Sequence, residues 1–204
     1  PPLPSSALCV VFFLIVGLLV RIPYTRAMAA DSKTAEAAAS YLLWFIPAMA
    51  LQFAMVAMGA GLRGVGNFKP GTVVATGSVL LNMLLAPFLI FGWVTGHPFG
   101  VAGAAMASLI SIVIGIIWIT TYIYAKDSYL KFDRADQKPQ MVIWKKVLGI
   151  GLPAGVEFGL MSVYLVIVYS ITRGFGAAAQ AGFGIGMRII QSGMMPVIAL
   201  GFAV

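Results

Sequence analysis

Six long apolar stretches, separated by short polar segments, constrain this 204-residue chain more than any other feature. The hydrocarbon core of a bilayer is about 30 Å thick, so a helix needs roughly 20 apolar residues to cross it. Inside a bilayer the backbone must satisfy its own hydrogen bonds, which favours helices for runs of this length. The predicted transmembrane helices cover residues 3–20, 37–62, 72–94, 101–124, 147–172 and 177–204.

The composition agrees with this interpretation. Apolar residues make up 61% of the chain and charged residues 9%, whereas soluble domains are roughly 45–50% apolar and about 25% charged. These values exclude a water-soluble enzyme, a coiled coil, a disordered chain and a disulfide-stapled secreted domain. The single cysteine, Cys9, cannot form an internal disulfide. We therefore predict an all-α integral membrane fold. The chain begins with Pro1 and ends at Val204 inside an apolar run, so we expect a piece of a longer protein.

The basic residues between the predicted helices indicate the orientation. Eight lie on one side of the membrane: Arg63, Lys69, Lys126, Lys131, Arg134, Lys138, Lys145 and Lys146. Four lie on the other side: Arg21, Arg26, Lys33 and Arg173. The positive-inside rule places the richer side in the cytoplasm, which suits a bacterial inner membrane.

The longest polar segment, residues 126–146, predicts a division into two bundles. Residues 1–125 supply four helices and residues 147–204 supply two, with 126–146 as a cytoplasmic linker. Its basic residues alternate with Asp127, Asp133 and Asp136, and contact with membrane lipid explains them better than binding to nucleic acid.

Glycine and proline are frequent inside the predicted helices. Gly103, Ala107, Ser111 and Gly115 recur every four residues, a small-residue stripe that lets two helix backbones approach closely. Gly182 and Gly186 form a shorter stripe, and Pro47, Pro87, Pro153 and Pro196 interrupt apolar runs. Both residue types are common in membrane helices in general. Taken together, the pattern favours a transporter or channel over a simple anchor.

Only two ionisable residues, Glu157 and Arg188, fall well inside a predicted span. A charged group in the membrane is costly, so each is a candidate functional residue. Glu157 shares a helical face with Met161 and Tyr164, and Arg188 shares one with Gln191. This combination suits a cavity for bulky, partly cationic guests, because methionine adapts its shape and tyrosine attracts cations. The alternative is a static ion pair between Glu157 and Arg188.

Two further polar residues, Gln52 and Asn82, lie within apolar runs. We interpret each as an interhelical hydrogen-bonding residue rather than as a ligand contact. His97 has no acidic or cysteine partner nearby in sequence, which speaks against a metal site. The chain lacks a Walker loop, a metalloprotease helix motif and a nucleophile elbow. We therefore expect no enzyme activity, no cofactor and no metal.

Four segments, taken in order, resemble the multidrug and toxic compound extrusion (MATE) family. They are LRGVGNFKP at 62–70, followed by Asn82 and Pro87, PFGVAGAAMA at 98–107, GIGLPA at 149–154 and AAAQAGFGIGMR at 177–188. The resemblance runs from about residue 41 to residue 204.

The resemblance implies a twelve-helix, two-lobe transporter, of which this chain supplies helices three to eight. Family members exchange H⁺ or Na⁺ for organic cations by alternating access, and many carry a functional acid in the seventh helix, where Glu157 is the candidate here. We expect such a protein to act as a monomer on small organic, cationic substrates. A related flippase for lipid-linked oligosaccharide or peptidoglycan precursors is the alternative, although several cavity-lining basic residues are typical of it. A channel or an integral-membrane enzyme fits less well, because the sequence lacks charge rings and clustered catalytic groups.

Overall fold

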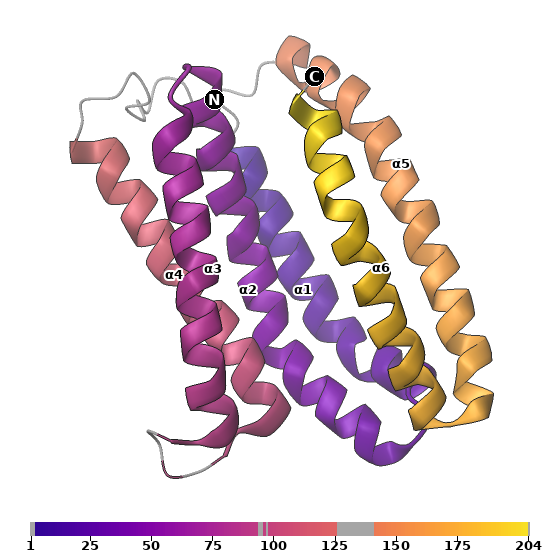
Figure 1. Ribbon diagram of the computed structural model, residues 1–204. Coiled ribbons are helices and arrows are strands. Elements are labelled where there is room, and N and C mark those ends of the chain that lie inside the picture. Colours follow the sequence, from indigo (N-terminus) through magenta and orange to yellow (C-terminus); the bar gives the residue numbers. More distant parts are fainter. Residues whose placement is uncertain (1–2, 94–95, 97, 126–140, 204) are drawn as a thin grey trace. The chain divides into compact units, whose positions relative to one another are not determined.

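The computed structural model describes residues 3–93, 96, 98–125 and 141–203. Within these ranges the chain is helical and contains no strand. The elements are α1 (Leu3–Met28), α2 (Ser32–Gly64), α3 (Phe68–Phe91), α4 (Gly100–Ala125), α5 (Met141–Thr172), the 3-10 turn η2 (Arg173–Phe175) and α6 (Ala177–Ala203) (Figure 1). This confirms the all-α prediction, with one helix for each of the six predicted spans.

Five of the helices are long and apolar enough to cross a membrane: segments of α1 and α5, and the whole of α2, α3 and α4. For α6 the criterion applies only as far as Pro196, so the sixth predicted span, residues 177–204, stays a prediction. The chain is a multi-pass integral membrane protein.

The loop predicted over residues 21–36 is much shorter in the structure. Helix α1 continues through Arg21, Pro23 and Arg26 to Met28, and α2 begins at Ser32. Asp31 fixes this start. Its Oδ1 accepts a hydrogen bond from the Thr34 backbone N–H at 2.6 Å, and its backbone carbonyl accepts one from the Ala35 N–H at 3.0 Å. Asp31 is therefore the N-cap of α2.

Helix α5 also begins earlier than predicted, at Met141 rather than near residue 147. The remainder of the predicted linker, residues 126–140, and His97 lie outside the described residues. Contacts within the chain divide it into two units. One comprises Pro1–Pro23 and Ala37–Leu148, and the other Tyr24–Glu36 and Gly149–Val204. The proposed lobes of the complete transporter, 1–125 and 147–204, stay a prediction.

In the first unit, α3 and α4 lie side by side (Figure 1). All four members of the predicted small-residue stripe, Gly103, Ala107, Ser111 and Gly115, are buried. A Cβ atom at Gly103 would lie 2.6 Å from the Leu89 carbonyl oxygen. This confirms close packing along α4. The shorter stripe on α6 is different, because a Cβ at Gly182 or Gly186 would meet nothing within 4 Å among the described residues.

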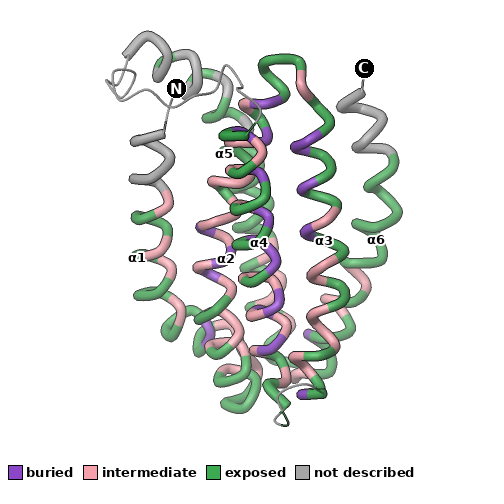
Figure 2. The backbone as a smooth tube through the Cα atoms, turned by 90° about the vertical axis from the view of Figure 1, so that its left-hand side faces the viewer, coloured by how far each residue is buried: buried purple, intermediate pink, exposed green. Residues whose placement is uncertain are grey.

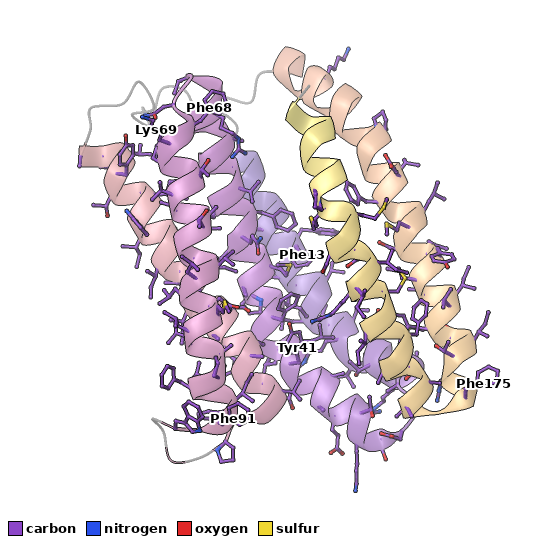
Figure 3. The ribbon with its side chains drawn as sticks, viewed as in Figure 1. Phe13, Tyr41, Phe68, Lys69, Phe91 and Phe175 are labelled. Atoms are coloured by element: carbon purple, nitrogen blue, oxygen red, sulfur yellow. The ribbon has the colours of Figure 1, made fainter. Side chains whose placement is uncertain are left out.

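The apolar core of the first unit lies near the junction between α2 and α3. It consists of Leu62, Val74, Ile119 and Ile123, with Met55, Met58 and Tyr122 packed against it. Figure 2 shows the buried positions along α2, α3 and α4. Lys69 and Phe68 lie at this end of α3, and Phe91 at the opposite end (Figure 3).

Candidate transport site

Glu157 and Arg188 lie on neighbouring helices of the second unit, α5 and α6. Both side chains are exposed in this chain. Among the described residues there is no ion pair, by a 4.0 Å criterion, between the Glu157 carboxylate and the Arg188 guanidinium. The static ion-pair alternative therefore receives no support from this conformation, and the functional role of each residue stays a prediction.

Glu157 lies within the apolar stretch Gly151–Phe175, which covers most of α5 and continues through η2. Its depth in the membrane stays a prediction.

The predicted neighbours of Glu157 are also accessible. Met161 is 45% exposed and Tyr164 is 56% exposed, and they lie one and two turns after Glu157 on α5. Gln191 on α6 is exposed as well. Large apolar side chains cover the other faces of α5, among them Leu152, Phe158, Leu160, Val163 and Ile167. Such a helix is covered by lipid or by further protein, which makes an acid on it conspicuous.

Asn82 is an interhelical hydrogen-bonding residue, as predicted. Its Nδ2 donates to the Ser108 Oγ at 3.0 Å, linking α3 to α4, and Ser108 donates to the Ala104 carbonyl at 3.2 Å. Gln52 on α2 is half-buried and makes no hydrogen bond to the described part of the chain. Gln52 and Asn82 belong to the first unit and Glu157 to the second.

Two polar residues that the sequence analysis did not select make long-range contacts in the second unit. The Gln180 Nε2 donates to the Met28 carbonyl at 2.9 Å and to the Tyr169 carbonyl at 3.1 Å. The Arg173 Nη1 donates to the Ala27 carbonyl at 2.9 Å. Gln180 is only 9% exposed. The available signal was a lone amide side chain within a run of alanine and glycine.

Ser111 on α4 is a third polar residue whose surroundings the sequence did not indicate. It is 1% exposed, and its Oγ has no hydrogen-bond partner in the described structure. Its place in the small-residue stripe explains this. The position needs a small side chain, and the hydroxyl adds no contact. No group of three or more His, Cys, Asp or Glu residues that could hold a metal occurs in the described ranges.

Known proteins are similar to this chain in both sequence and fold. Residues 5–88 match the MatE family model. The probable multidrug resistance protein YoeA of Bacillus subtilis is 26% identical over 93% of this chain and 42% of its own length. The multidrug export protein MepA of Staphylococcus haemolyticus is 28% identical over 93% of this chain and 45% of its own length.

A solved structure agrees with these matches. It is described as the inward-facing conformation of a multidrug resistance MATE family transporter of the MOP superfamily. It superposes with a TM-score of 0.86 at 26% identity, over 96% of this chain and 44% of its own. The chain thus spans less than half the length of the proteins it matches. The matches in sequence and in fold together support the resemblance of this chain to the MATE family.

Proposed function

We propose that the full-length protein is a secondary multidrug efflux transporter that exchanges H⁺ or Na⁺ for small organic cations. The observation that carries this proposal is Glu157, the acid within the apolar stretch Gly151–Phe175 of a chain that resembles the MATE family. The names of the relatives support the substrate class, since YoeA is called a probable multidrug resistance protein and MepA a multidrug export protein.

The chemistry of the α5 face suits such a substrate. Glu157 supplies a single negative charge that either a coupling cation or a cationic drug can neutralise. The exposed Met161 and Tyr164 follow on the same helix. A thioether packs against guests of different shapes, and an aromatic face attracts organic cations. Competition of the two cations for one carboxylate would couple their movements in opposite directions.

Arg188 and Gln191 on α6 complete the proposed site. In this conformation Arg188 is not paired with Glu157, so the Glu157 carboxylate is free to accept another cation. An arginine on the neighbouring helix favours release, because it repels a cationic guest when the two helices approach. Gln191 supplies a neutral amide that can donate to or accept from a drug.

The orientation follows from the charge distribution. We place Arg63, Lys69 and the 126–146 linker in the cytoplasm of a bacterial inner membrane, with the Tyr24–Glu36 segment and Arg173 on the outside. The two sets of helices, in 1–125 and 147–204, would belong to different lobes of a monomeric transporter. Alternating access then requires that the ends of these helices separate on one side at a time.

The test is efflux of a cationic dye by the full-length protein in inverted vesicles under an imposed proton or sodium gradient. Glu157→Gln should abolish gradient-driven transport. Glu36→Gln, the same chemical change at an exposed residue near the start of α2, should leave transport unchanged. Equal transport by wild type and Glu157→Gln would refute a role for this carboxylate.

The same assay addresses the alternative. Failure of the wild-type protein to move any cationic dye would overturn a cationic substrate class. Arg188 would then be the residue to pursue, because an arginine favours a phosphate-containing guest. Flipping of a lipid-linked pyrophosphate would be measured next, comparing wild type with Arg188→Gln.

A further inference from the structure

The Tyr24–Glu36 segment is held by the far end of the chain. The segment contains the last turn of α1, a short loop and the first turn of α2, and its contacts group it with Gly149–Val204. It lies beside the turn between α5 and α6 (Figure 1). Three hydrogen bonds from Gln180 and Arg173 to the carbonyls of Ala27, Met28 and Tyr169 make up what we call the clasp.

Gln180 is well suited to join two helices. An amide NH₂ group has two donor hydrogens, and the structure uses one for each helix. The Met28 carbonyl lies in the last turn of α1 and the Tyr169 carbonyl in the last turn of α5. Carbonyls in the last turn of a helix have no backbone partner within the helix, although the Tyr169 carbonyl also accepts the Thr172 hydroxyl at 3.2 Å. Gln180 therefore caps the C-terminal ends of two different helices at once.

Arg173 strengthens the same contact. Its guanidinium donates to the Ala27 carbonyl, one residue before Met28. The carbonyl end of a helix carries a partial negative charge, so a cation there is favourable. Arg173 is exposed, and water screens this attraction. On the α5–α6 side, the Tyr169 and Phe183 rings meet edge to face with centroids 5.4 Å apart, which holds the two helices that carry the clasp.

We propose that the clasp is a latch that holds the outer ends of the helices together and opens when the transporter opens outward. This inference rests on the proposed function for its cycle. The bonded carbonyls lie at helix ends, where water replaces the donors once the ends separate. Opening therefore leaves no unsatisfied polar group in lipid, and each bond has a small net value. A contact of this kind can break and re-form in every cycle.

The expected effect follows from the number of bonds that cross the clasp, which are Gln180 to Met28 and Arg173 to Ala27. Loss of the Gln180–Met28 bond shifts the ratio of clasped to open molecules on the order of fivefold toward open. Loss of the Arg173 bond as well brings the shift to roughly fiftyfold, since this second bond is charge-assisted. A bound ligand or an ion gradient shifts the ratio of clasped to open molecules by a comparable factor, so the effect of these substitutions should be measurable beside it.

The experiment measures the distance between two spin labels by double electron–electron resonance in the full-length protein. The labels replace Lys33 in α2 and Phe175 in η2, on either side of the clasp, in a background without native cysteines. Both positions are exposed, and Phe175 lies at the α5–α6 turn (Figure 3). Gln180→Met, and more strongly Gln180→Met with Arg173→Ala, should increase the fraction of molecules at long distance.

Two matched variants separate the hydrogen bonds from packing. Gln180→Lys keeps a side chain of similar length with donor hydrogens, so it should retain the short distance. Ser192→Ala removes a hydroxyl whose hydrogen bond stays inside α6, to the Arg188 carbonyl, and should change nothing. An unchanged distance distribution in the double variant would overturn the latch, and so would equal shifts with Gln180→Met and Gln180→Lys.

The distance measurement needs no substrate, which separates this inference from the proposed function. If the wild-type protein transports no dye but the double variant still opens at the clasp, the latch stands and the substrate class is wrong. If dye transport depends on Glu157 and the distances never change, the function stands and the latch is wrong.

Discussion

The substitution Gly103→Ala tests the close approach of α3 and α4. A Cβ at this position would lie 2.6 Å from the Leu89 carbonyl oxygen, 2.7 Å from its carbonyl carbon and 3.0 Å from the Ile90 nitrogen. All three are backbone atoms of α3, so no side-chain rotation relieves the overlap. Contact in the ordinary range begins at 3.4 Å, which means that the two helices must separate locally by several tenths of an ångström.

This separation has an additional cost. The Leu89 carbonyl also accepts the Phe99 backbone N–H at 3.3 Å, a bond that helps to close the connection between α3 and α4. Overpacking of this kind typically costs about 1–3 kcal/mol, and a strained hydrogen bond adds about 0.5–1.5 kcal/mol. We therefore expect Gly103→Ala to lower the free energy of unfolding by about 2–4 kcal/mol.

Two further glycine-to-alanine substitutions extend the prediction to a graded series. At Gly115 the nearest neighbours of a Cβ are the Ser78 Oγ and, at 2.9 Å, the Met55 Sδ. These are side-chain ends that can move, so Gly115→Ala should cost about 1–2 kcal/mol. At Gly182 nothing lies within 4 Å, and Gly182→Ala should be neutral or stabilising by up to about 1 kcal/mol.

Unfolding of the full-length protein in mixed micelles, at increasing mole fractions of denaturing detergent, gives the three values. The reasoning is refuted if Gly103→Ala is as stable as wild type, or if Gly115→Ala is the more destabilised of the two.

Three further predictions address polar groups. Asn82→Leu should lower the free energy of unfolding by about 1 kcal/mol. Ser108→Ala should lower it much less in the Asn82→Leu background than in the wild type, as a double-mutant cycle in the same assay would show. Additive effects would contradict the Asn82–Ser108 bond. Ser111→Ala removes a buried hydroxyl without a described partner, so it should leave stability unchanged or raise it by up to about 1 kcal/mol, and a clear loss of thermal stability would mean that the hydroxyl has a partner. The hydrogen bonds from the Thr34 backbone and side chain lower the pKa of the Asp31 carboxyl below its usual 3.8. Because the pKa is lower in the folded than in the unfolded protein, the carboxylate stabilises the fold above the unfolded pKa, and this stabilisation is lost as pH falls through the folded pKa. Amide exchange in the first turn of α2, corrected for intrinsic rates, should therefore accelerate at acidic pH in wild type and lose this pH dependence in Asp31→Asn.

The sequence predicted the helices well, because hydropathy over 20 residues is a strong local signal. It also predicted the burial of the α4 stripe and the bonding role of Asn82, since small residues and amides in apolar runs have few alternatives. It misplaced the loop between α1 and α2. Arg21 and Arg26 looked like loop residues, although both lie on α1, within the candidate span Val10–Met28. Charge marks the end of an apolar run, but it does not end a helix.

The clasp was beyond the reach of sequence reasoning for a different reason. Gln180 bonds to Met28 across 152 positions, and no periodicity or spacing connects residues so far apart. The partner atoms are backbone carbonyls, which every residue has, so the side chains of Ala27 and Met28 carry no sign of the contact. Glu157 and Arg188, in contrast, were found easily because charge in an apolar run is rare, and their roles await the transport assay.

The long separation within the clasp also affects the order in which the protein matures. Ala27 and Met28 are synthesised well before Arg173 and Gln180, which follow them by 146 and 152 positions. At about 5–20 residues per second, ribosomes need on the order of ten seconds to close this gap.

During that interval the C-terminal carbonyls of α1 depend on water or on the insertion machinery for their hydrogen bonds. The turn between α1 and α2 is thus made before its partners and reaches its final contacts only after α6 has been synthesised. A nascent chain arrested after α4 would expose this turn to protease at the membrane surface, whereas the completed chain would protect it.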